Sequence, residues 1–182
     1  MTKIYLIRHG KAAAGFDASA DPDLDDTGRL QAAATARMLQ TLGPMPILSS
    51  PLARAQQTAA ALAALWQTTV VIEKRVSEIP SPSTDLAARS SWLRAAMQGS
   101  WSDLDETLIK WRDNLVGCLL EIPADCMVFS HFVAINAAVG AASNDDRMVV
   151  FRPDNASVTT LESDGSRLRV LELGKTADTH VN

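Results

Sequence analysis

The chain has 182 residues, of which 47% are hydrophobic and 21% charged, a composition typical of globular proteins rather than disordered ones. The formal net charge of −4 disfavours broad contacts with nucleic acid or an anionic membrane surface, and no apolar run is long enough to cross a bilayer. We therefore expect one domain over residues 1–182, with no nucleic-acid partner and no membrane partner.

The N-terminus and the cysteines favour a cytoplasmic location. The apolar run after Lys3 stops at Arg8, which is too short for the hydrophobic region of a signal peptide. Cys118 and Cys126 are too few for a disulfide framework and fit a reducing compartment. We expect both thiols to be small buried apolar groups.

Strand-like and helical patterns alternate along much of the chain. In chain order, they predict a strand at 3–7, helices at 27–42 and 51–66 separated by a strand at 47–49, a strand at 69–73, helices at 84–97 and 103–121, and strands at 127–130, 148–151, 157–161 and 168–173. This alternation predicts a three-layer α/β/α sandwich with a mostly parallel sheet. The Asp164-Gly165 pair is typical of a hairpin turn, so the C-terminal strands are expected to be antiparallel.

Three helix starts carry capping signals. Asp25 is a candidate N-cap for the first helix, which stops at Gly43-Pro44. Ser50 and Pro51 have the pattern of an N-cap and first helical position, and Ser102 has the pattern of an N-cap for the helix at 103–121. The first helix is expected to bury a face made of Leu30, Ala34, Met38 and Leu42.

Chemically distinctive side chains follow several of the predicted strands. Arg8-His9-Gly10 ends the first strand, Arg54 follows the second, Glu78 follows the third, and His131 ends the strand at 127–130. Open α/β sheets bind ligands beyond the carboxyl ends of their strands, so we expect these side chains to converge. The third histidine of the chain, His180, lies in a polar tail and is given no role.

This cluster is cationic although the protein is acidic, and a phosphoryl group is the ligand that fits it. Guanidinium groups bind phosphate oxygens through paired, charge-assisted hydrogen bonds. Arg8 and Arg54 should also disfavour protonation of His9, leaving a lone pair for attack on phosphorus. Such a nucleophile needs no metal, and we expect Gly10 to let the phosphate approach closely.

The motifs together resemble the histidine phosphatase superfamily, also called the phosphoglycerate mutase-like family. Its Arg-His-Gly motif is present at residues 8–10, its helix entry at 24–32 and its Ser-Ser-Pro-Leu-x-Arg-Ala-x-x-Thr-Ala segment at 49–59. Residues 128–131 resemble the strand that ends in the second catalytic histidine, and residues 155–158 resemble the late Asn-x-Ser-Val strand. The resemblance covers nearly the whole chain and implies a phosphoglycerate mutase-like fold.

The resemblance also implies roles for the clustered residues. His9 is expected to form a phosphohistidine; Arg8, Arg54 and His131 are expected to bind the phosphoryl oxygens; and Glu78 is expected to be the proton donor. No cofactor and no metal ion are implied. The expected reaction is two-step hydrolysis of a phosphomonoester or phosphoramidate.

Several positions depart from the family pattern. The stretch from Glu78 to Pro82 replaces a more usual glycine-bearing stretch, so Glu73 and Asp103 remain alternative proton donors. Gly15 stands where the family frequently has Asn, and Phe132 stands where it has Gly after the second histidine. These departures concern substrate handling more than phosphoryl binding.

Alternative functions remain open at this point. The substrate is expected to be a phosphorylated small molecule, or a phosphohistidine protein facing the acidic loop at 17–26, and a noncatalytic phosphate-binding protein is the competing class. The chain is shorter than typical family mutases, which favours a phosphatase. Residues 23–27 also fit the Asp-x-Asp-x-Thr motif of Mg²⁺-dependent haloacid-dehalogenase-like phosphatases, but no strand-like run precedes Asp23.

Overall fold

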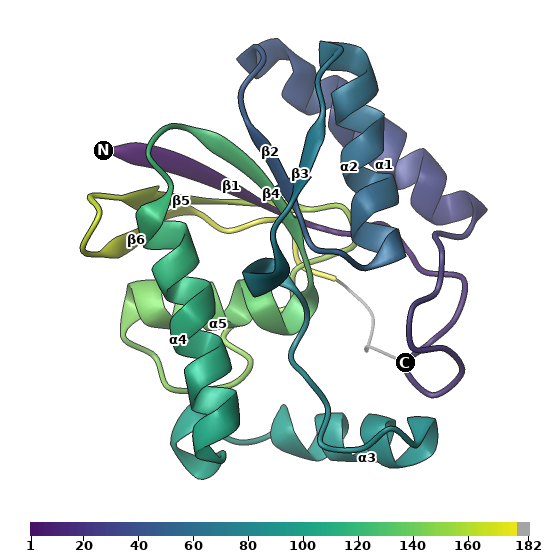
Figure 1. Cartoon of the computed structure of the whole chain (residues 1–182), viewed down its shortest axis with the longest axis vertical. Coiled ribbons are helices and arrows are strands. Elements are labelled where there is room, and N and C mark those ends of the chain that lie inside the picture. Colours follow the sequence, from purple (N-terminus) through teal and green to yellow (C-terminus); the bar gives the residue numbers. More distant parts are fainter. Residues whose placement is uncertain (178–182) are drawn as a thin grey trace.

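The computed structural model describes residues 1–177, so His180 lies outside the described residues, and its centre is a twisted six-stranded sheet (Figure 1). The strand order is β3-β2-β4-β1-β5-β6. Strands β1 to β4 run parallel, whereas β5 is antiparallel to both β1 and β6. The strands are β1 (Thr2–Arg8), β2 (Ile47–Ser49), β3 (Val70–Ile72), β4 (Cys126–Ser130), β5 (Val158–Ser163) and β6 (Leu168–Glu172).

Helices cover both faces of this sheet (Figure 1). On one face lie α1 (Asp26–Leu39) and α2 (Ala53–Trp66), and on the other lie α4 (Glu106–Glu121) and α5 (Phe132–Ser143). A shorter helix, α3 (Leu86–Ala96), stands apart from these layers, and three 3₁₀ turns occupy Gln40–Leu42, Lys74–Val76 and Trp101–Asp103. The predicted α/β sandwich is confirmed. Within residues 1–177, no helix combines the length and apolar character needed to span a membrane.

The pleat of the central strands divides the buried core between the two faces. On β1, Ile4 and Leu6 belong to the cluster under α4 and α5, whereas Ile7 belongs to the cluster under α1 and α2. On β4, Val128 and Phe129 divide in the same way. Because both faces are covered, these strands are apolar throughout, and their ends are the first places where polar side chains can appear.

Two local signals are confirmed at atomic detail. The Asp25 carboxylate accepts a hydrogen bond from Gly28 N at 2.7 Å and caps α1, as predicted. The Asp164-Gly165 turn joins the antiparallel strands β5 and β6, and Gly165 has a φ of +87°, which glycine adopts without a Cβ clash.

The buried face predicted for α1 is wrong. Leu30, Met38 and Leu42 are 73%, 59% and 46% exposed, respectively. The residues that α1 buries are Gly28, Ala32, Ala36 and Leu39. Small side chains let α1 approach the alanine-rich α2 closely, so volume rather than hydrophobicity decides which face is inward.

Two helix starts also differ from prediction. Helix α2 begins at Ala53 after Leu52, whose side chain makes no capping bond, and Asp21 Oδ1 accepts from Ala53 N at 2.8 Å. Ser50 is not the N-cap, because it lies two residues before the cap position at Leu52, whose N–H donates to Ser50 Oγ at 3.2 Å. Helix α4 begins at Glu106 with Asp105 as its N-cap, and Ser102 lies in the preceding 3₁₀ turn.

The segment after β4 departs furthest from the predicted elements. Helix α5 was not predicted, because its run from Phe132 to Gly140 is buried on every side and shows no amphipathic period. The strand predicted at 148–151 is absent. There, Val150 N and Phe151 N donate to the buried Asn136 side chain of α5 at 2.8 and 3.0 Å, which satisfies the backbone without a partner strand.

Candidate active site

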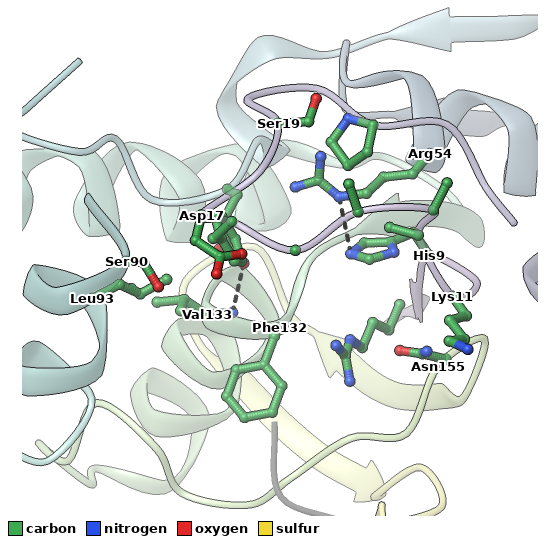
Figure 2. Close-up of a pocket in the computed structure, with 18 of the residues that line it drawn as sticks. His9, Lys11, Asp17, Ser19, Arg54, Ser90, Leu93, Phe132, Val133 and Asn155 are labelled. Atoms are coloured by element: carbon green, nitrogen blue, oxygen red, sulfur yellow. Dashed lines mark hydrogen bonds between the residues drawn. The ribbon is translucent and has the colours of Figure 1, made fainter. Parts of the chain in front are cut away.

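A pocket of about 530 Å³ opens where the parallel strands end (Figure 2). Arg8, at the end of β1, lines this pocket together with His9, Arg54 and Glu78. His131 is the N-cap residue of α5, and the centroid of its ring lies 5.2 Å from that of His9. The structure therefore brings all five predicted residues together from β1, α2, α5 and the loop after Lys74–Val76.

The geometry of His9 leaves one ring nitrogen available. Nδ1 lies 2.7 Å from Gly10 O, and a carbonyl only accepts, so Nδ1 carries the proton of the neutral ring. Burial, followed by the nearby Arg54 and Arg8 charges, holds the pKa of His9 well below its usual value. The lone pair on Nε2 accepts from Arg54 Nε at 3.2 Å. His9 is thus a buried neutral imidazole with its basic nitrogen beside Arg54.

The two arginines have unused hydrogen-bond donors. Arg8 Nη1 donates to Pro153 O at 2.8 Å, but its Nε is buried without a hydrogen-bond partner. Arg54 Nη1 also lacks a hydrogen-bond partner, although Asp21 Oδ1 lies 3.8 Å away. Burial lowers the pKa of Arg8 to about 10 and lowers that of Arg54, so both remain cations at neutral pH.

His131 Nδ1 is a third buried atom without a partner. Such a set fits the oxygens of a phosphoryl group.

Glu78 is fixed by backbone groups. Its Oε1 accepts from Ile79 N and Ala134 N at 3.0 and 3.1 Å, and its Oε2 accepts from Val133 N at 3.2 Å. Burial raises the pKa of Glu78, against the opposing effects of these bonds and of Arg54. Among residues 1–177 it is the one buried acidic side chain.

The alternative carboxylates occupy other places. Glu73 pairs with Arg75 at 2.9 Å, and the Asp103 side chain accepts from Ser100 N at 3.1 Å. Neither lines the pocket, whereas the exposed Asp17 does. Asp23 follows a loop and accepts from Gln57 Nε2, so it lacks the strand that an aspartyl nucleophile requires. In the part of the chain that the structure describes, no three His, Cys, Asp or Glu residues are grouped to hold a metal ion.

Residues that were given no role in the sequence analysis support this site. Thr58 Oγ1 accepts from Gly10 N at 3.0 Å and donates to Arg54 O at 2.7 Å, which ties the end of β1 to the first turn of α2. Glycine is required at position 10 for a different reason from the one expected. A Cβ on Gly10 would lie 2.5 Å from Gly28 O, so the close packing of α1 against this segment excludes any larger residue. The motif at residues 49–59 contains Thr58, but the motif alone does not indicate which groups Thr58 contacts.

Apolar residues form the wall farther from His9. Phe132 extends into the pocket, and the Arg8 guanidinium carbon lies 5.1 Å from its ring centroid (Figure 2). Leu93 and Met97, from α3 and its C-cap, line the same pocket, as does Phe16 from the loop after β1. Neither Trp92 nor Trp101 lines this pocket, and Trp101 is buried in the core.

Comparison with known proteins places these observations in a family. The model of the histidine phosphatase superfamily, branch 1, matches residues 4–176. A curated relative, the probable phosphoglycerate mutase GpmB of Erwinia tasmaniensis, is 25% identical over 186 residues, which cover 89% of this chain and 85% of the relative. Its counterpart from Photorhabdus laumondii is 24% identical and covers 77% of this chain and 74% of the relative.

Solved structures share the fold. A mycobacterial glucosyl-3-phosphoglycerate phosphatase in complex with inorganic phosphate has a TM-score of 0.77 and 20% identity, covering 99% of this chain and 100% of the other. A phosphoserine phosphatase of Entamoeba histolytica in complex with 3-phosphoglyceric acid also has a TM-score of 0.77, with 23% identity over 97% of this chain and 98% of the other. At these identities the likeness concerns the fold.

Proposed function

The chain belongs to the histidine phosphatase superfamily, branch 1, and on that premise we propose that it is a metal-independent phosphatase. It hydrolyses a phosphomonoester or phosphoramidate through a phosphohistidine on His9. One observation carries the proposal: a buried neutral imidazole with a fixed Nδ1 proton adjoins three unpartnered polar atoms, on Arg8, Arg54 and His131. That arrangement offers a nucleophile and a cradle for the phosphoryl oxygens.

The first step transfers the phosphoryl group to His9. The substrate's oxygens take up the donors of Arg8, Arg54 and His131, and Nε2 attacks phosphorus in line with the leaving oxygen. The N–P bond forms while the P–O bond to the leaving group breaks. Protonated Glu78, whose pKa is raised by burial, gives its proton to the departing oxygen.

The second step returns the enzyme to its starting state. The Glu78 carboxylate takes a proton from water, and the water oxygen attacks the phosphohistidine. The N–P bond breaks, inorganic phosphate leaves, and His9 is again neutral with its lone pair on Nε2. Glu78 serves as acid and then as base, so the residue ends each cycle protonated.

The pocket favours a small phosphorylated molecule over a phosphohistidine protein. Its volume of about 530 Å³ and its mixed apolar and charged lining suit the leaving group of a small molecule. The structural neighbours named above are phosphatases of small phosphorylated compounds. We also propose that the chain acts in the cytoplasm, on the cysteine content alone.

Turnover of 4-nitrophenyl phosphate in the presence of EDTA tests the proposal. We expect the parent protein and Asp23→Ala to release nitrophenol at equal rates, and His9→Ala to fall to background. Loss of activity with EDTA together with loss in Asp23→Ala would support the aspartyl mechanism instead. Phosphate binding without turnover of any phosphomonoester would identify a binding protein. Product analysis of a sugar or glycerate phosphate distinguishes hydrolysis from the mutase reaction, because a mutase returns phosphate to the product.

A further inference from the structure

The two ring nitrogens of His131 have different environments. The residue is fully buried, and its Nε2 lies 2.8 Å from Ser50 Oγ. Its Nδ1 is buried without a partner, although the His9 ring is close by. A neutral imidazole carries one N–H and one lone pair, so the contact at Nε2 decides what Nδ1 can do.

The hydrogen bonds of Ser50 indicate where its proton goes. Leu52 N donates to Ser50 Oγ at 3.2 Å, and Ser77 Oγ lies 3.4 Å from Ser50 Oγ, a pair in which either hydroxyl can be the donor. A hydroxyl has two lone pairs and one proton. If Leu52 and Ser77 donate to the two lone pairs, the Ser50 proton points at its nearest neighbour, His131 Nε2. Every hydrogen-bonding capacity of Ser50 is then used.

The backbone holds this hydroxyl in place. Ser50 N donates to Phe129 O at 3.0 Å, so Ser50 is tied to β4 two residues before His131. Ser50 and His131 are both fully buried, and the Ser50 hydroxyl is surrounded by His131 Nε2, Leu52 N and Ser77 Oγ. The hydroxyl therefore has a fixed position relative to the His131 ring.

An unprotonated phosphoryl oxygen only accepts hydrogen bonds, so it distinguishes the two tautomers of His131. With the proton on Nδ1, the unpartnered nitrogen is a donor; with the proton on Nε2, its lone pair would face the oxygens and repel them. Burial, with the neighbouring His9, Arg54 and Arg8, lowers the pKa of His131 and keeps the ring neutral. These three are the titratable or charged groups that act on it from β1 and α2.

We propose that Ser50 is a positioning residue: its hydroxyl donates to His131 Nε2 and thereby holds the ring proton on Nδ1, where it binds the phosphoryl group. This inference rests on the proposed function, because it assigns Nδ1 to a phosphoryl oxygen. Ser50 acts only through His131 and touches neither the substrate nor His9.

Kinetics supply the first test. Ser50→Ala should lower kcat/KM for 4-nitrophenyl phosphate by about 10²-fold, the typical effect of losing one oxyanion donor. Ser49→Ala is the matched control; the Ser49 hydroxyl donates to the Ser50 carbonyl at 2.9 Å, so the change removes a neighbouring buried hydroxyl but leaves the bonds of Ser50 Oγ, and we expect a loss of less than about threefold. In the double variant Ser50→Ala/His131→Ala, activity should equal that of His131→Ala alone, because both changes remove the same donor. Additive losses would overturn the proposal.

The ¹⁵N NMR spectrum of the histidine rings supplies the second test and needs no turnover. In the folded parent protein, alone and with inorganic phosphate, we expect His131 to carry its proton on Nδ1. In Ser50→Ala, of unchanged melting temperature, the proton should move to Nε2 or divide between the nitrogens. A parent ring protonated on Nε2, or a tautomer that Ser50→Ala leaves unchanged, would overturn the inference. If the parent protein shows no turnover but has the predicted tautomer, the proposed function fails while the tautomer assignment stands.

Discussion

Arg54 acts on His9 both through its charge and through a hydrogen bond. Its charge, together with burial, lowers the pKa of His9 and keeps the ring neutral, and its Nε–H occupies the lone pair of Nε2 at 3.2 Å. Without a ligand, therefore, the basic nitrogen is engaged. Because Arg54 Nη1 has no hydrogen-bond partner, a phosphoryl group can draw the guanidinium into a paired contact and release Nε2 for attack. In the proposed mechanism, substrate binding and exposure of His9 Nε2 are then one event.

Replacement of Glu78 should affect substrates according to their leaving groups. Glu78→Gln keeps the shape but cannot transfer a proton, and general acid catalysis typically contributes about 10²–10⁴-fold. We expect a loss in that range of kcat/KM for an alkyl phosphate, whose alkoxide leaves only when protonated. The loss should be much smaller for phosphorylation of the enzyme by 4-nitrophenyl phosphate, whose leaving group is stable as an anion. Burst kinetics on both substrates measure the difference.

Asp17→Asn is the matched control, since Asp17 lines the same pocket but is exposed. If Glu78→Gln lowered the activity on both substrates equally, the assignment of Glu78 as the acid would be contradicted. The same conclusion would follow if Asp17→Asn alone showed the dependence on leaving group.

The pairing of α1 with α2 shows how small residues position a catalytic turn. Ala36 of α1 and Ala59 of α2 belong to one buried cluster, and both helices begin beside the pocket. Close packing of these helices brings Gly28 against the end of β1, where a Cβ on Gly10 would clash. The positions of His9 and Arg54 therefore depend on helix faces built mainly of glycine, alanine and threonine, with Leu39 and Leu62 as their large apolar side chains.

Substitutions on the two faces of α1 should differ in how much they change stability. Ala36→Leu should lower the free energy of unfolding by about 1–3 kcal/mol, because overpacking forces neighbouring groups apart. Leu30→Gln and Met38→Gln should each change it by less than about 0.5 kcal/mol, since both side chains are mostly exposed. Urea denaturation of the three variants measures these energies. A larger loss of unfolding free energy in Leu30→Gln than in Ala36→Leu would indicate that the face predicted from periodicity is the buried one.

The sequence allowed prediction of the elements whose patterns are local. The strands at the sheet centre, the Asp25 cap and the β5–β6 hairpin each depend on a short run of residues. Helix α5 could not be predicted, because burial on all sides removes the amphipathic period. The site residues were found because each follows a strand or opens a helix. Their partners were not, since Ser50–His131 and Thr58–Gly10 join segments 81 and 48 residues apart.

The buried histidines of the site lower the free energy of unfolding of the whole protein at low pH. His9 and His131 are buried and neutral in the folded protein, with pKa values well below the usual one. The unfolded chain protonates both at a pKa of about 6.5. Below that pH the unfolded state binds more protons, so the free energy of unfolding falls as the pH falls. The raised pKa of Glu78 acts in the opposite direction, because the folded state holds its proton more tightly.

Removal of one histidine should therefore reduce the dependence of stability on pH. Between pH 6 and 5, each buried neutral histidine contributes a slope of about 1.4 kcal/mol per pH unit. We expect His9→Asn to have a slope smaller than that of the parent protein by about this amount, while Glu78 contributes equally to both. Urea denaturation at a series of pH values measures the slopes. Equal slopes would mean that His9 is protonated in the folded state, which would contradict its assignment as nucleophile.

The covalent intermediate is the central claim, and trapping it is the most direct measurement. The protein is mixed with 4-nitrophenyl phosphate in EDTA, quenched within milliseconds in base, which preserves phosphohistidine, and analysed by intact mass and peptide fragmentation. We predict one added phosphoryl group on His9 that is lost in acid, with no label in His9→Ala. Turnover without label on His9, or label on an aspartate or serine, would contradict the account.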